Sequence, residues 1–343
     1  MSEVQVTLGV DSHRDMNVAV ALDQQGRMLG TRAVPTTRQG HSELLRWATN
    51  LGELTQVGVE GSSSYGAGLC RILRSQGILV LEVERPHRRS RRVAGKSDPL
   101  DAEKAARAVL AGEVRVVAKG GDGDVENLRM LWVTRAGAMK ARTQAANQLH
   151  ALVVTSPDRF KECLGSLSTK GLIRIAARWR PDPRRGRESV AKFAMRSVAR
   201  RYLELDLEIS SLDTEIQALV DAAAPALIAT KGIGYETAAA LLVAAGDNPE
   251  RLRTESAFAH LCGAAPVPAS SGKTVRHRLS RGGDRQANRA LFLIVLGRMR
   301  LDERTRNYVR RRTGEGLSKM EIIRCLKRYV AREVYPLLPR AAT

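Results

Sequence analysis

Residues 4–34, VQVTLGVDSHRDMNVAVALDQQGRMLGTRAV, decide the fold of the first part of the chain. Three runs at 4–10, 16–22 and 27–34 are rich in apolar residues and separated by polar, glycine-containing turns, which is typical of short β-strands. The elements expected next are a helix, a strand, a helix and a strand, at 38–50, 56–60, 65–76 and 78–84. This order predicts a mixed α/β sheet that begins with three meandering strands.

Four carboxylates lie at the ends of these predicted elements. Asp11 follows the first strand, Glu60 ends the fourth, and Asp98 and Asp101 lie three residues apart at the start of a further helix near Pro99. Residues three apart share one helix face, so Asp98 and Asp101 lie on the same side of that helix. Four carboxylates gathered at one sheet would repel each other unless cations lay between them. Mg²⁺ or Mn²⁺ is expected, because both accept carboxylate and water ligands. The alternative is that each acid caps a turn or helix, with Asp98 as the N-cap before Pro99.

Charge is the dominant feature of the composition. The 343 residues contain 56 Lys and Arg against 36 Asp and Glu, a formal net charge of +20. So basic a chain is expected to bind a polyanion, most simply nucleic acid. With 43% hydrophobic residues it can form an ordinary core, which excludes wholesale disorder.

The sequence contains no long apolar run, no recognisable signal peptide and no paired cysteines. We therefore expect a cytoplasmic, nucleoid-associated protein with no membrane partner, and we expect neither a zinc site nor a disulfide framework. The four cysteines, Cys70, Cys163, Cys262 and Cys325, are interpreted as buried or idle thiols.

Three segments are candidates for nucleic-acid contacts. The first is the basic run RPHRRSRR at 85–92, and the third is the basic loop at 262–289. The second is the Gly-Ile-Gly turn at 232–234, whose backbone amides could bind a phosphate. The alternative in each case is a solvated loop. The candidate residues are Arg85, Arg88, Arg89, Arg91, Arg92, Gly232, Gly234, Lys273, Arg276 and Arg278.

Two long helical regions are expected in the middle of the chain, after a glycine-rich stretch at 120–124 that predicts a flexible hinge. In the second region apolar residues recur at alternating spacings of three and four, which is a heptad seam. The seam residues are Met195, Val198, Tyr202, Leu205, Ile209, Leu212, Ile216 and Leu219. Such a seam could either pack the two helices of one chain together or join two protomers. The expected domains are 1–118, 125–224 and 225–343.

The opening hairpin is also similar to the first phosphate loop of actin-like ATPases and sugar kinases. Those proteins need a second Asp-Gly-rich phosphate loop and an adenosine loop, and neither is recognisable in this sequence.

Four stretches together resemble the DEDD transposases of the insertion sequence 110 family and the related Piv-type DNA invertases. They are GVDSH with Asp11, VGVEGSSSYG with Glu60, KSDPLDAEKAARA with Asp98 and Asp101, and GAAPVPASSGKTVRHRLSRGGDRQANRAL in the C-terminal part. The resemblance covers about 1–112 and 225–300 well. It does not extend to residues 154–190.

The resemblance implies an RNase H-like (RuvC-like) domain, a helical coiled-coil linker and a small, mostly α C-terminal domain. It also implies a serine that forms a covalent phosphoserine link with DNA; by position this is Ser271, with Ser270 as its nearest alternative. The implied partners are donor and target DNA and a structured guide RNA from the mobile element, and a homo-oligomer, dimer or tetramer, is expected. The competing function is a metal-dependent junction nuclease in which water attacks and Ser271 is only a loop residue.

Overall fold

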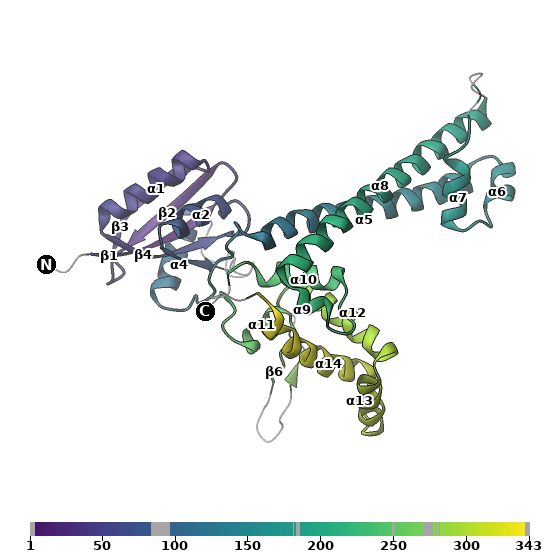
Figure 1. Ribbon diagram of the computed structural model, residues 1–343. Helices are drawn as coiled ribbons and strands as arrows, with labels where there is room; N and C mark the ends of the chain where they lie inside the picture. Colours follow the sequence, from purple (N-terminus) through teal and green to yellow (C-terminus); the bar gives the residue numbers. More distant parts are fainter. Residues whose placement is uncertain are drawn as a thin grey trace. The chain divides into compact units, whose positions relative to one another are not determined.

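The computed structural model describes residues 4–83, 97–180, 182, 186–248, 251–269, 277–278, 280 and 282–339. The chain divides into two compact units (Figure 1). One unit combines Met1–Glu126 with Leu241–Thr343, and the other comprises Asn127–Ala240.

A five-stranded mixed sheet forms the N-terminal part of the first unit, as predicted. Its strands are β1 (Gln5–Ser12), β2 (Met16–Leu22), β3 (Met28–Pro35), β4 (Glu53–Glu60) and β5 (Leu79–Val83). The spatial order is β3-β2-β1-β4-β5. The first three strands are antiparallel neighbours, whereas β1, β4 and β5 run parallel to one another.

Helices cover both faces of this sheet. The helices are α1 (Arg38–Leu51), α2 (Ala67–Ser75) and α4 (Asp98–Leu110). Val6, Leu8 and Val10 of β1 belong to the core formed with α1 and α2. Because side chains alternate along a strand, Gly9 and Asp11 face the opposite side of the sheet. That side is covered by α4, whose Ala102 and Ala106 pack with residues of β2.

The second unit is built on a hairpin of two long helices, α5 (Asp124–Thr155) and α8 (Arg187–Ala223). The helices are antiparallel, since Arg135 pairs with Asp213 and Arg142 with Asp206. Two short helices, α6 (Asp158–Leu164) and α7 (Thr169–Ala176), pack at the end of the hairpin (Figure 1).

The heptad seam of α8 is used within the chain. Met195 and Val198 pack against Ala145 and Leu149 of α5 in one core cluster, and Ile216 is also buried. The structure thus supports the alternative in which the seam joins the two helices of one chain.

The C-terminal part of the chain is mostly helical, as expected. Its elements are α9 (Pro225–Ile228), α10 (Tyr235–Ala245), α11 (Glu255–Leu261), β6 (Val267–Pro268), β7 (His277–Arg278), α12 (Arg285–Leu301), α13 (Glu303–Gly314), α14 (Lys319–Val334) and η2 (Tyr335–Leu337). Local capping sets several boundaries: Asp284 accepts hydrogen bonds from the first turn of α12, and Ser318 with Glu321 forms a capping box on α14. None of the described helices is long and apolar enough to cross a membrane.

The glycine-rich stretch at 120–124 is anchored and is not the flexible hinge that its composition predicts. The side chain of Asn248, which is 5% exposed, accepts a hydrogen bond from the Gly120 N–H (3.0 Å) and donates one to the Ala118 carbonyl (2.9 Å). The Asp247 carboxylate accepts from the Val125 N–H (2.8 Å). We call these three hydrogen bonds the 118–248 clip. They tie the end of the sheet region and the start of α5 to the segment that follows α10.

Candidate functional site

The site is built on the carboxyl ends of two adjacent parallel strands. Asp11 of β1 and Glu60 of β4 are register partners at this edge of the sheet. Both are buried, with 4% and 6% of their surface exposed. The Ser12 hydroxyl donates a hydrogen bond of 2.5 Å to the Glu60 carbonyl, which fixes the two strand ends relative to each other.

A pair of glycines brings α4 against these strands. Gly9 and Gly58 are register partners two residues before the two acids and lie on the same sheet face as they do. A Cβ at Gly9 would collide with the main chain of Ala102 and Ala106, and one at Gly58 would lie 3.2 Å from the Ala105 carbonyl. The helix can approach this closely only because both side chains are absent. Its first turn is thereby placed over the acidic edge.

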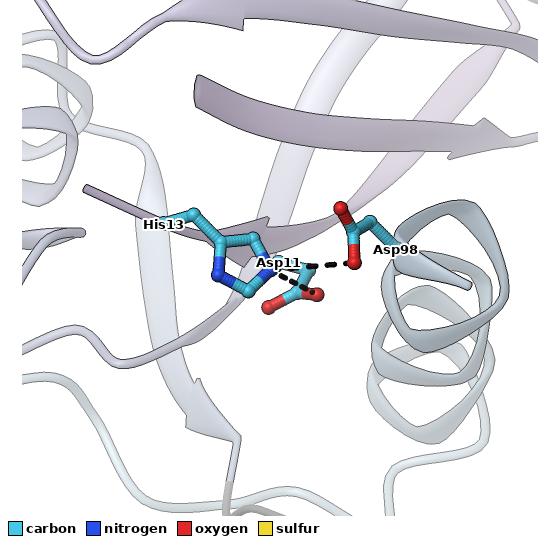
Figure 2. A group of neighbouring side chains, drawn as sticks. All are labelled: Asp11, His13 and Asp98. Carbon is cyan, nitrogen blue, oxygen red and sulfur yellow. Dashed lines mark hydrogen bonds and ion pairs between the residues drawn. The ribbon is translucent and has the colours of Figure 1, made fainter. Parts of the chain in front are cut away.

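Asp98, in that first turn, joins Asp11 through a histidine. His13 Nε2 lies 3.0 Å from Asp11 Oδ2 and 3.5 Å from Asp98 Oδ1 (Figure 2). One ligand atom from each of the three residues lies within 4.8 Å of the other two. His13 is not among the site residues predicted from the sequence. The available signal is the spacing Asp-x-His at a strand end, which puts both side chains on one side of the strand.

Asp101 and Glu60 are buried in the same region but are not members of this three-residue cluster. Asp101 is 6% exposed and its Oδ1 lies 3.2 Å from Lys104 Nζ. The N-cap of α4 is Ser97, so the alternative of Asp98 as an N-cap is wrong. Asp98 is instead the first helical residue, and its carboxylate is directed to His13.

The donor set fits a divalent cation. Two carboxylate oxygens and an imidazole nitrogen converge, and Asp11 is almost fully buried among neighbours that include a second buried acid. Carboxylates suit Mg²⁺ and Mn²⁺, and an imidazole is a better ligand for Mn²⁺ than for Mg²⁺. Asp11, His13 and Asp98 could therefore hold a cation, with Glu60 and Asp101 next to them in the fold.

Several predicted site residues lie outside the described residues: Arg85, Arg88, Arg89, Arg91, Arg92, Ser271, Lys273 and Arg276. Arg278 is exposed on β7, which pairs with β6. These two strands flank in sequence the segment that contains Ser271.

The Gly-Ile-Gly turn uses part of its backbone internally. Gly232 has a φ of +82°, which favours glycine. The Ile233 N–H donates to the Thr230 carbonyl, and the Gly234 N–H donates to the Thr237 hydroxyl at 3.1 Å. Two amides that the sequence offers to a phosphate are therefore already hydrogen-bonded, and a phosphate contact of this turn stays a prediction.

The cysteines are free, as expected. Burial raises the pKa of the Cys70 thiol to about 12 and also raises the pKa of the buried Cys262 thiol. Both thiols are therefore protonated at neutral pH and poor nucleophiles.

Known proteins match this chain from the sheet to the end of α5 and again in the C-terminal part. A family model of DEDD transposases, described as "Transposase", matches residues 8–156, and a second, described as "Transposase IS116/IS110/IS902 family", matches residues 224–310. An uncharacterized 43.6 kDa protein of insertion element IS110 from Streptomyces coelicolor is 33% identical over 131 residues, which is 37% of this chain and 32% of that protein. An uncharacterized 42 kDa protein of insertion element IS900 from Mycobacterium paratuberculosis is 24% identical over 376 aligned positions, covering 94% of this chain and 93% of that protein. The first of these matches thus spans only about a third of its relative, whereas the second runs almost from end to end. With both family models matched in order along one sequence, the chain belongs to the IS110 family of transposases.

Proposed function

We propose that this protein moves a DNA element by cutting and rejoining DNA strands, with a divalent metal held by its acids and a covalent phosphoserine intermediate. The observation that carries the proposal is the convergence of Asp11, Asp98 and His13 beside the buried Glu60, in a chain of the transposase family. Its sheet is proposed to be an RuvC-like domain.

The residues proposed to hold the metal are Asp11, Glu60, Asp98 and Asp101, with Mg²⁺ or Mn²⁺ as the ion. When bound, such an ion polarises a phosphodiester and stabilises the charge that develops on its oxygens. The protein's own contribution is to bury Asp11 and Glu60 at adjacent strand ends and to bring the first turn of α4 over them. Because these acids repel one another, a cation stabilises the site.

Ser271 is proposed as the nucleophile. Its oxygen would form a bond to the phosphorus while the bond from phosphorus to one deoxyribose oxygen breaks, and that oxygen leaves with a proton. A DNA hydroxyl would later reverse the step, releasing the serine and rejoining the strand. Gly272 and Lys273 follow Ser271, so the backbone can approach DNA closely with a cation beside it.

The proposed partners are donor and target DNA and a structured guide RNA, bound by an oligomer of this chain. A net charge of +20 supports nucleic-acid binding in general. The residues proposed to contact nucleic acid are Arg85, Arg88, Arg89, Arg91, Arg92, Gly232, Gly234, Lys273, Arg276 and Arg278.

The test is a cleavage reaction on DNA carrying the element's ends, with denaturing gels to detect protein attached covalently to DNA. Ser271→Ala should abolish the adduct, and Ser270→Ala, the matched control, should keep it. Asp11→Asn and Glu60→Gln should each abolish both cleavage and the adduct while DNA binding persists, because only the metal ligands change. Cleavage by the Ser271→Ala protein would favour the nuclease in which water attacks, and full activity of both acid variants would contradict the metal site.

A further inference from the structure

The end of the α5–α8 hairpin has a core that α6, α7 and the start of α8 share with the last turns of α5. We call α6, α7, the first turns of α8 and the other described residues within 158–201 the hairpin head (Figure 1). Leu172 and Ile173 of α7 are buried with Met195 of α8, and the rings of Phe160 and Trp179 lie 5.6 Å apart. This core fixes α7 on α8, so side chains on their outer faces have defined positions.

The hairpin head is strongly basic. Its described residues include eleven Lys and Arg against four Asp and Glu, a net charge of +7. Solvated protein surfaces usually intersperse both signs of charge. The excess here is therefore unusual for a face that only meets water.

The cations form two rows. Lys170, Arg174 and Arg178 follow one another at intervals of four residues along and just beyond α7, and all three are exposed. A second row on α8 has the same interval: Lys192, Arg196 and Arg200. Residues four apart on a helix are separated by about 6 Å along its axis, so the row on α8 extends over about 12 Å.

The two rows meet at one end and lack acidic partners. Arg200 Nε donates to the Ala177 carbonyl at 3.4 Å, which places Arg200 beside Arg178. Among the described residues none of the six cations forms an ion pair; the acid Glu188 pairs with Arg159 instead. Like charges four residues apart on a helix repel each other, so a bound polyanion would relieve repulsion in both rows.

An exposed aromatic ring lies among these charges. Phe193 is 63% exposed, although a ring of this size is normally buried. It precedes Arg196 by three residues and Arg200 by seven, so the three share one side of α8. That side is opposite to the one from which Met195 and Val198 enter the core. Cations with an interspersed exposed ring are typical of surfaces that bind single strands, because the backbone follows the charges and a base stacks on the ring.

We propose that the hairpin head binds single-stranded DNA, with phosphates along the two rows and an unpaired base on Phe193. The proposal rests on the proposed function, because exchange of DNA strands separates a duplex and exposes such segments. DNA is the occupant because it is the substrate of a transposase, whereas a duplex would present no free base to Phe193.

The test measures binding of the full-length protein to fluorescent oligothymidine of about 20 nucleotides, longer than a typical single-strand site. Fluorescence anisotropy is recorded over a range of salt concentrations without divalent metal, so that no cleavage interferes. The plot of log affinity against log salt has a negative slope, and the variant Lys170→Gln/Arg174→Gln/Arg178→Gln should make it shallower by about 2, since each lost contact on a single strand removes about 0.7 from its magnitude. The matched control Arg38→Gln/Arg46→Gln/Arg115→Gln removes three exposed charges elsewhere and should leave the slope close to that of the wild type.

Substitution of Phe193 tests the stacking. Phe193→Ala should weaken oligothymidine binding by about 5- to 100-fold, while binding to a duplex of equal length stays unchanged. Phe193→Trp should retain affinity because it keeps an aromatic face. Phe193→Leu should lose as much as Phe193→Ala, because apolar bulk without a ring cannot stack. Thermal unfolding of each variant checks that the hairpin head remains folded.

Equal salt slopes for the two triple variants would overturn the proposal, and so would full affinity in Phe193→Leu. A loss seen with oligouridine but not with oligothymidine would assign the surface to RNA and overturn it as stated. Failure of this proposal can be told apart from failure of the proposed function. Binding to the hairpin head is measured without metal, whereas the acid variants that test the proposed function are scored by DNA cleavage.

Discussion

Gly9→Ala adds one methyl group at the contact that positions the metal site. The new Cβ would collide with the main-chain oxygen of Ala102 and the main-chain nitrogen of Ala106. Neither atom can rotate away, because both belong to the backbone of α4. The helix must therefore move off the sheet, and its first residue, Asp98, must move away from His13 and Asp11.

The expected cost follows from the kind of atom that is hit. Overpacking a well-packed core costs about 1–3 kcal/mol, and collision with backbone argues for the upper end. Replacing Gly by Ala also removes freedom from the unfolded chain, which offsets about 0.4–1 kcal/mol. We expect a net loss of about 2–3 kcal/mol. For a unit of about 150–250 residues this lowers the midpoint of thermal unfolding by roughly 5–10 °C.

Two measurements on the same protein test this reasoning. Calorimetry should show the lower midpoint, and Mn²⁺ titration followed by paramagnetic resonance should show weaker binding at a temperature where the variant is folded. Gly30→Ala on β3 is the matched control: its Cβ would meet only the ring of Trp47, at 3.3 Å, and the midpoint should change little. An unchanged midpoint and unchanged Mn²⁺ affinity in Gly9→Ala would refute the close approach of α4 as the cause of the site geometry.

Three other predictions concern the rest of the chain. Asn248→Ala should destabilise the protein by about 2–5 kcal/mol, because the buried Gly120 N–H and the buried Ala118 carbonyl each lose a hydrogen-bond partner. Urea unfolding measures this free energy, and a loss below about 1 kcal/mol would contradict the clip. Leu203→Asp with Leu207→Asp should dissociate the proposed oligomer, because these two leucines lie exposed one turn apart on α8. Light scattering measures the mass, and an unchanged mass would exclude this face. Burial, with the nearby Arg71, lowers the pKa of His41 below 6.5, so the folded state disfavours its protonation. The stability that depends on neutral His41 is then full above pH 6.5 and declines as the pH falls below it, and His41→Gln should flatten that decline in chemical unfolding at several pH values.

The sheet and its acids could be predicted because their signals are local. Alternating apolar residues define each strand, and parallel pairing of β1 with β4 brings Asp11 next to Glu60 without further information. His13 was missed because a histidine after a strand has no distinctive pattern of its own. Its role depends on α4, whose position is set by Gly9 and Gly58.

The hinge prediction failed for a different reason. Glycines at 120–124 indicate local freedom, but the partners that anchor this stretch, Asp247 and Asn248, lie more than a hundred residues further along the chain. Local composition contains no information about such a contact. The heptad seam is a similar case, because its spacing predicts a helix partner without identifying which helix it is.

The 118–248 clip also determines the order in which this protein can be completed during synthesis. Ala118 leaves the ribosome 130 residues before the asparagine that binds its carbonyl. The segment 116–118 can pair with β5 at once, because the Ala118 N–H donates to the Val80 carbonyl, but the Ala118 carbonyl waits for Asn248 while the whole α5–α8 hairpin is made. Closing a loop of that length costs only slightly more than closing a shorter one, because the entropy varies with the logarithm of loop length. The hairpin is thus an insertion whose two ends are held together, and we expect a hairpin of another length to leave the hydrogen bonds of the clip in place.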